Sequence, residues 1–172
     1  MTNNLISKKI SLNGILLALG VVSLFAATTL PTSRLSFYTL SSFLVSIIII
    51  EFGVKAGWIF YFSSCILTLI ILPDKLGLLP YVFFFGIYGI IKFYIEKFNN
   101  LVIEYSIKIV FFTICMLSGL FLIKEFILSN IEIKFPIWVI IIALELIFII
   151  YDYVYTQFIQ YYNVKLKKML KL

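Results

Sequence analysis

The sequence has no histidine, two cysteines and four prolines, and only 13% of its 172 residues are charged. Histidine-based metal sites, Ser-His-Asp triads and multi-cysteine zinc sites are therefore excluded. An ordinary soluble domain is about 45–50% apolar and about 25% charged. Here 63% of the residues are hydrophobic and the mean hydropathy is +1.13, which excludes a soluble globular enzyme. Any chemistry must use carboxylates, lysine, arginine, tyrosine and the backbone, and no metal or cofactor is expected.

Long apolar runs are what the chain does contain, and they predict an all-α polytopic membrane protein. A membrane-spanning helix needs roughly 20 mostly apolar residues. Charges, prolines and glycines divide the chain into six such runs. The six spans and their connections fill a single transmembrane domain and leave no room for a water-soluble one. The predicted spans are 10–30, 35–52, 55–73, 76–97, 101–128 and 136–162, followed by a basic tail at 163–172.

Two parts of this layout have alternatives. Lys8 and Lys9, followed by an apolar run, imitate a secretory signal peptide, although the run is long for a signal and the rest of the chain is itself apolar. The second and third runs are short and are joined by Gly53, so a re-entrant hairpin is an alternative to two full spans. Six full spans are the preferred prediction.

The distribution of lysine and arginine predicts that both termini are cytoplasmic. With the N-terminus inside, nine of the 14 basic residues fall on the cytoplasmic side and four fall outside. This basic rim would face the anionic headgroups of the lipid bilayer. No basic segment is long enough to suggest nucleic-acid binding. The heavy use of residues with AT-rich codons is typical of a low-GC bacterium, so the expected location is a bacterial cytoplasmic membrane. The inner set is Lys8, Lys9, Lys55, Lys92, Lys97, Lys165, Lys167, Lys168 and Lys171; the outer set is Arg34, Lys75, Lys124 and Lys134.

Ionisable residues inside spans are costly, and they mark structural pairs or functional sites. Glu145 lies nine residues after Pro136, about 14 Å deep in a core about 30 Å thick. It is either a protonated group bonded to a neighbouring helix or a contact for substrate or protons. Asp152 lies seven residues further along the same face, and Lys108 reaches a similar depth from the inner side of an antiparallel fifth helix. We therefore predict a structural Lys108–Asp152 ion pair, with Glu104 as a competing or additional partner of Lys108.

Two further features concern the helix surfaces and the outer side. Gly14 and Ala18 form a small-xxx-small step on the first helix, which suits either intramolecular packing or docking to another subunit. Arg34 is the sole arginine and lies in a polar loop with aromatic neighbours. It is a candidate clamp for an anionic ligand group, with a plain interfacial charge as the alternative.

The start of the chain resembles a known family. The basic lead Lys8-Lys9-Ile10-Ser11-Leu12 is followed by Gly14-Ile15-Leu16-Leu17-Ala18-Leu19-Gly20 and by six compact spans in the whole chain. This arrangement resembles the substrate-binding S components of energy-coupling factor (ECF) transporters, over the whole chain in layout and over the first twenty residues in motif. The resemblance implies an S-component-like bundle that binds a vitamin or related micronutrient from outside. No signature of a particular vitamin branch is present, so the chain resembles an orphan branch.

The resemblance also implies partners and site residues. Transport would be energised by a transmembrane T subunit and two ATPases, since this chain has no phosphate-binding Gly-Lys-Ser/Thr loop. The family's first helix typically docks to the T subunit through an Ala-xxx-Ala step, for which Gly14-xxx-Ala18 stands here with glycine in the first place. A ligand would bind in an outward cavity lined by the first outer loop and the outer halves of helices four to six. The implied ligand-binding residues are Arg34, Tyr81, Trp138 and Glu145.

Two other classes of function compete with this one. A membrane scaffold similar to rod-shape-determining membrane protein D would have a similar length, six spans and a related fold, but would bind no nutrient. An intramembrane enzyme would need paired catalytic groups. Glu145 and Asp152 lie about 10 Å apart along one helix, too far to share a proton, so we do not expect an enzyme.

Overall fold

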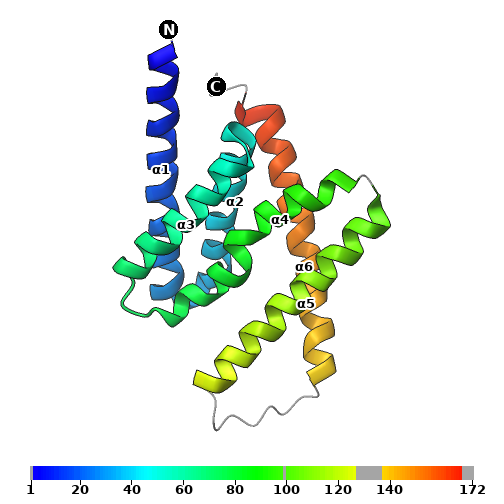
Figure 1. The fold of residues 1–172 in the computed structure, drawn as a ribbon. Helices are drawn as coiled ribbons and strands as arrows, with labels where there is room; N and C mark the ends of the chain where they lie inside the picture. The colour runs from blue at the N-terminus through cyan, green and yellow to red at the C-terminus, as the bar shows by residue number, and fades with distance from the viewer. Residues whose placement is uncertain (1, 99, 127–136, 168–172) are drawn as a thin grey trace. The chain divides into compact units, whose positions relative to one another are not determined.

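The computed structural model describes residues 2–98, 100–126 and 137–167, and this part of the chain is helical without a strand (Figure 1). Six of its helical segments are long and apolar enough to cross a membrane. The predicted fold class, an all-α polytopic membrane protein, is confirmed. Pro136, Lys134, Lys168 and Lys171 lie outside the described residues. The long helices are α1 (Thr2–Thr29), α2 (Arg34–Phe52), α3 (Val54–Ile71), α4 (Gly86–Ile95), α5 (Leu101–Phe126) and α6 (Ile137–Tyr161).

α2 and α3 end next to a glycine and a proline. α2 is followed by its C-cap Gly53, whose φ of +84° lies in the region that favours glycine. α3 is followed by its C-cap Leu72, which is extended because it precedes Pro73. At 1.5 Å per residue the 19 residues of α2 and the 18 residues of α3 measure about 28 and 27 Å. Both lengths are close to the thickness of a hydrocarbon core, which favours two full spans over a re-entrant hairpin.

The chain divides into two compact units, which are described separately. Unit 1 comprises Met1–Phe93 and unit 2 comprises Tyr94–Leu172. The boundary falls inside α4, where neither proline nor glycine marks it in the sequence.

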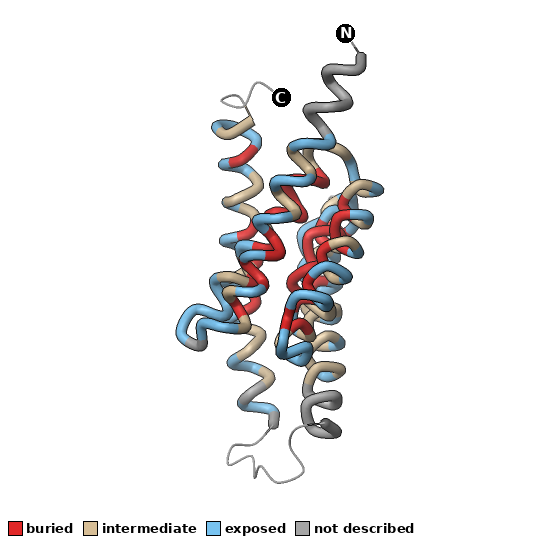
Figure 2. Tube along the Cα trace, turned by 90° about the vertical axis from the view of Figure 1, so that its left-hand side faces the viewer, coloured by how far each residue is buried: buried red, intermediate tan, exposed pale blue. Residues whose placement is uncertain are grey.

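α2 forms the centre of unit 1. It packs against both α1 and α3, and nine of its 19 residues are buried. Buried positions, red in Figure 2, alternate with exposed ones along the helices around it. The run Leu44–Ile49 is buried without interruption, as expected of a helix that is apolar on every side. α2 therefore supplies most of the core that positions the neighbouring helices.

The entry to α4 is irregular. A π-helical segment, Tyr81–Phe85, follows Pro80 and leads into α4. The Tyr61 hydroxyl on α3 donates a hydrogen bond to the Val82 carbonyl at 2.8 Å, which ties this segment to α3. A Cβ at Gly86 would lie 2.7 Å from the Tyr61 ring, so only glycine permits the close approach. π-helical segments are rare in proteins, and those that occur often lie at functional sites.

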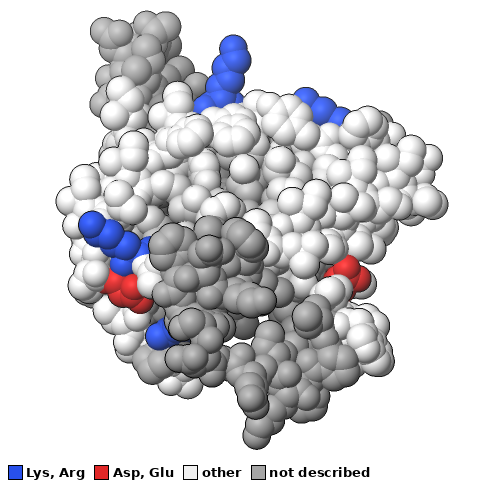
Figure 3. All heavy atoms as spheres, turned by 60° about the horizontal axis from the view of Figure 1, so that its bottom comes forward, with Lys and Arg blue, Asp and Glu red and all other residues white. Residues whose placement is uncertain are grey.

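Unit 2 contains the antiparallel pair α5 and α6. The residues of α5 and α6 that contact each other run in opposite directions: as the residue number rises along α5, that of its partner on α6 falls. The described part of α5 exposes mostly apolar side chains, as expected of a helix surrounded by lipid. Charged side chains are few on the face of the molecule in Figure 3. The contacts that define the register are Thr113–Glu145, Phe112–Phe148 and Lys108–Asp152.

Candidate functional site

Unit 2 contains a cluster of three charged side chains around Lys108. Lys108 Nζ lies 3.1 Å from Asp152 Oδ2 on α6, which is the contact that the sequence predicts. It also lies 3.3 Å from Glu96 Oε1. The side chains of Lys108 and Asp152 are each 5% exposed, whereas that of Glu96 is 39% exposed. The Lys108–Asp152 contact is therefore a buried ion pair, and Glu96 joins it from a wetter position.

Burial makes the two contacts of Lys108 unequal. Breaking a buried ion pair by removing one partner costs about 3–5 kcal/mol, because the other charge is left unpaired. An exposed pair contributes about 0–1 kcal/mol. Asp152 is thus the partner on which the position of Lys108 depends. The Tyr105 ring, with its centroid 5.6 Å from Lys108 Nζ, adds a cation–π contact on the α5 side.

Glu145 is held by a hydroxyl of the facing helix. Thr113 Oγ1 lies 3.0 Å from Glu145 Oε1 and 2.9 Å from the Ile109 carbonyl oxygen. A threonine hydroxyl has one proton to donate. That proton can be donated to either acceptor, the Ile109 carbonyl oxygen or Glu145 Oε1, and the second contact ties Glu145 to α5. This contact fits the structural interpretation of Glu145, a group hydrogen-bonded to a neighbouring helix.

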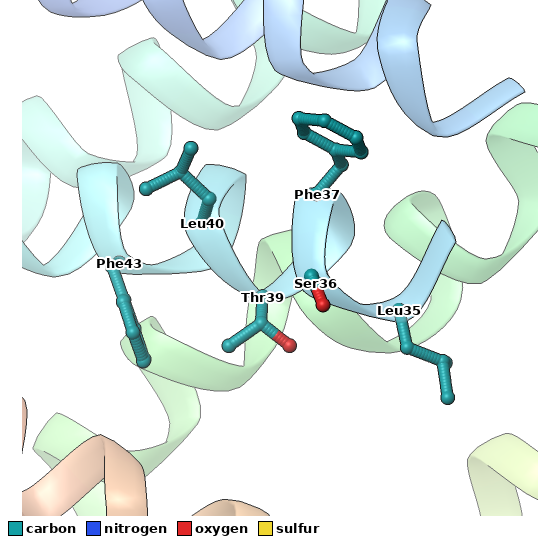
Figure 4. A pocket seen from close by; sticks show the side chains of 6 residues that line it. All are labelled: Leu35, Ser36, Phe37, Thr39, Leu40 and Phe43. Atoms are coloured by element: carbon teal, nitrogen blue, oxygen red, sulfur yellow. The ribbon is translucent and has the colours of Figure 1, made fainter. Parts of the chain in front are cut away.

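Arg34 begins α2 and is exposed. A shallow, mostly apolar depression of about 460 Å³ starts at the next residue and follows one side of α2 (Figure 4). In the close-up the Leu35 and Phe43 side chains mark its two ends, and Ser36 and Thr39 supply its hydroxyl groups. Arg34 is not one of the residues that line the depression, but it directly precedes Leu35 in the sequence, and a guanidinium is suited to hold an anionic group.

The other two predicted ligand-binding residues have contrasting environments. Tyr81 is 0% exposed, and its hydroxyl lies 2.7 Å from Ser64 Oγ within unit 1. Trp138, near the start of α6, is 64% exposed. Within unit 1, Arg34 and Tyr81 do not share an environment, because one is at the surface and the other is inside the helix packing. Within unit 2, Trp138 and Glu145 lie seven residues apart on one side of α6.

Sequence reasoning missed two charged residues. Glu96 was not connected with Lys108, although a short connection at 99–100 joins their helices and brings residues on either side of it to similar depths. Lys92, which the sequence predicts to lie on the cytoplasmic side, is 1% exposed, with Nζ 6.0 Å from the centroid of the Tyr88 ring, and the sequence did not predict this burial. A lysine stem can run along an apolar helix face, so its position in the sequence does not report where its charge lies.

In the described part of the chain, no group of three or more acidic or cysteine side chains is arranged to hold a metal ion. Cys65 and Cys115 are free thiols. Comparison with protein-family models, curated proteins and solved structures finds no match to this chain.

Proposed function

We propose that this chain is the membrane-embedded substrate-binding subunit of a micronutrient or vitamin uptake transporter, located in a bacterial cytoplasmic membrane. A separate T subunit and ATPases supply the energy. The observation that carries the proposal is an open face on α1, formed by Gly14 and Ala18.

Gly14 and Ala18 lie one turn apart on α1, and both are exposed. A Cβ added at Gly14 would meet no atom within 4 Å among the described residues. The intramolecular packing that would otherwise explain a small-xxx-small step is therefore not found at Gly14. Small residues on a membrane helix let a second backbone approach closely, so this face suits a helix of another subunit.

The ligand side of the proposal rests on Arg34 and Glu145. Arg34 directly precedes Leu35, the first residue that lines the depression on α2, and would hold an anionic group. Glu145, with Thr113 beside it, presents hydrogen-bonding groups between α5 and α6. Small-molecule sites are mostly apolar with a few placed polar groups, and both places have that character.

Docking is tested by purifying the tagged chain from its native membranes and identifying co-purifying subunits by mass spectrometry. Gly14→Leu combined with Ala18→Leu fills the face, and we expect it to abolish co-purification of the T subunit. Ala143→Leu is the matched control, because Ala143 is an exposed small residue on α6. Retention of the T subunit by the double variant, or its equal loss in the control, would refute docking through α1.

One observation favours the alternative, a scaffold similar to rod-shape-determining membrane protein D. Tyr81 and Glu145, two of the four residues assigned to the ligand, already have hydrogen-bonding partners inside their own units. A scaffold needs such residues only for packing. The two functions are distinguished by whether the purified protein retains a ligand.

A further inference from the structure

The π-helical segment Tyr81–Phe85 leaves the carbonyl of Val82 without its usual backbone donor. In a regular α-helix the Gly86 N–H group would bond to the Val82 carbonyl, four residues back. Here it bonds to the carbonyl of Tyr81, five residues back. An unpaired carbonyl in a membrane-spanning segment is unfavourable, because lipid offers no donor. The π-helical form therefore needs a donor from outside its own backbone.

A side chain on α3 supplies this donor. The Tyr61 hydroxyl donates a hydrogen bond to the Val82 carbonyl at 2.8 Å. The Tyr61 ring passes close to Gly86, where an added Cβ would lie 2.7 Å from two of the ring atoms. The hydroxyl of Tyr61 and the missing side chain of Gly86 therefore act together to stabilise the π-helical form.

The start of the segment is fixed to the same side of α3. Tyr81 is 0% exposed, and its hydroxyl lies 2.7 Å from Ser64 Oγ. Ser64 follows Tyr61 by three residues, so the two side chains lie on one side of α3. A change of helix type within the segment would therefore leave Tyr81 in place and move the residues that follow it.

The residues after the segment would then face a different side. A π-helical turn holds more residues than an α-helical turn, so the segment acts as one inserted residue. Conversion to α-helix would turn the residues from Gly86 to Phe93 by about 100°, the rotation of one residue. Each residue would take the side of the helix on which the next residue lies now. Lys92, which is 1% exposed, would take the side of Phe93, which is 37% exposed.

We propose that the Tyr61 hydroxyl holds the Tyr81–Phe85 segment in its π-helical form, and that its release turns the following part of α4 and exposes Lys92. The two forms exchange one hydrogen bond for another. The Val82 carbonyl accepts from Tyr61 in the π-helical form and from the Gly86 N–H group in the α-helical form. This device places the exposure of a buried lysine under the control of one hydroxyl on α3, and it is independent of the function proposed above.

The test is the rate at which Lys92 reacts with an amine-modifying N-hydroxysuccinimide ester, read by mass spectrometry on the full-length protein in detergent micelles. Tyr61→Phe removes the hydroxyl and keeps the ring. We expect it to raise the Lys92 rate about five-fold, the change in population that the loss of one hydrogen bond produces. Gly86→Ala, whose methyl group displaces the Tyr61 ring, should raise the rate in the same way.

Two matched controls separate this rotation from a general loss of packing. Tyr38→Phe removes a hydroxyl that also donates to a backbone carbonyl, that of Gly77, outside the π-helical segment. Gly20→Ala adds a Cβ that meets only ordinary van der Waals contacts, at 3.7–3.8 Å. Neither control should change the Lys92 rate. Lys108, which is 4% exposed, should stay unreactive in every variant.

An unchanged Lys92 rate in Tyr61→Phe would overturn the proposal. So would an equal rise in Tyr38→Phe, or a rise at Lys108 that matches the rise at Lys92, because either result would show general opening of the packing. A high-resolution structure of Tyr61→Phe gives a second measurement. The Gly86 N–H group should bond to the Val82 carbonyl there, and a bond still made to the Tyr81 carbonyl would contradict the proposal.

Discussion

Replacing Asp152 by asparagine tests the charged cluster of unit 2 directly. The change keeps the size of the side chain and removes the charge that faces Lys108 Nζ at 3.1 Å. At that distance and an effective dielectric constant near 20, the Coulomb attraction is about 5 kcal/mol. Part of it offsets the desolvation of two side chains that are each 5% exposed. We therefore expect Asp152→Asn to lower the free energy of unfolding by about 3–5 kcal/mol.

Glu96 provides the matched comparison, because it contacts the same Nζ from a side chain that is 39% exposed. Glu96→Gln should cost no more than about 1 kcal/mol. Replacing both members of the buried pair, as Lys108→Met with Asp152→Leu, should cost less than Asp152→Asn alone, because no buried charge is left unpaired and the remaining Glu96 is 39% exposed. The measurement is reversible unfolding of the purified protein in mixed micelles with increasing SDS. Equal losses of unfolding free energy for Asp152→Asn and Glu96→Gln would refute the reasoning. So would a double variant that loses more unfolding free energy than Asp152→Asn.

Three further predictions concern the helix ends, Glu145 and the topology. Gly53→Ala should lower the unfolding free energy by about 1–3 kcal/mol in the same SDS titration, because φ +84° with ψ 169° is a backbone region essentially restricted to glycine; an unchanged unfolding free energy would contradict this strain. Thr113→Val should cost about 0.5–1.5 kcal/mol in the same titration, because it removes the hydroxyl that lies 3.0 Å from Glu145 Oε1; no loss would show that this hydrogen bond does not stabilise the helix pair. The topology is tested in a variant with both native cysteines replaced by serine. There Lys75→Cys should react with an impermeant maleimide in intact cells, and Lys55→Cys should react only after permeabilisation. The reverse pattern would place the termini outside.

The sequence was sufficient to predict depth along each helix. The 1.5 Å rise and the charged or breaker residues at the span ends put Lys108 and Asp152 at similar depths, and the structure has them in contact. Gly53 and Pro73 likewise indicate where α2 and α3 end, because their backbone preferences act locally.

The sequence was not sufficient to predict how each helix is rotated about its axis. Tyr81 was assigned to an outward cavity, yet it is buried against Ser64. Rotation depends on packing, and the π-helical segment that begins at Tyr81 shifts the face that follows it. The hydropathy pattern carries little information about this rotation, because the lipid-facing side and the packed side of a membrane helix are both apolar. The burial of Lys92 was likewise not predicted, because a long lysine side chain can run along an apolar helix face.

The central claim, that this chain binds a small molecule for uptake, is tested most directly by what the purified protein retains. The protein is purified from native membranes, denatured, and its extract analysed by mass spectrometry beside Arg34→Gln and the exposed-site control Ala143→Leu. The account predicts one enriched small molecule in the unmodified protein and in the control, and its loss in Arg34→Gln. An empty extract, together with altered cell shape when the protein is depleted, would contradict the account and favour the scaffold.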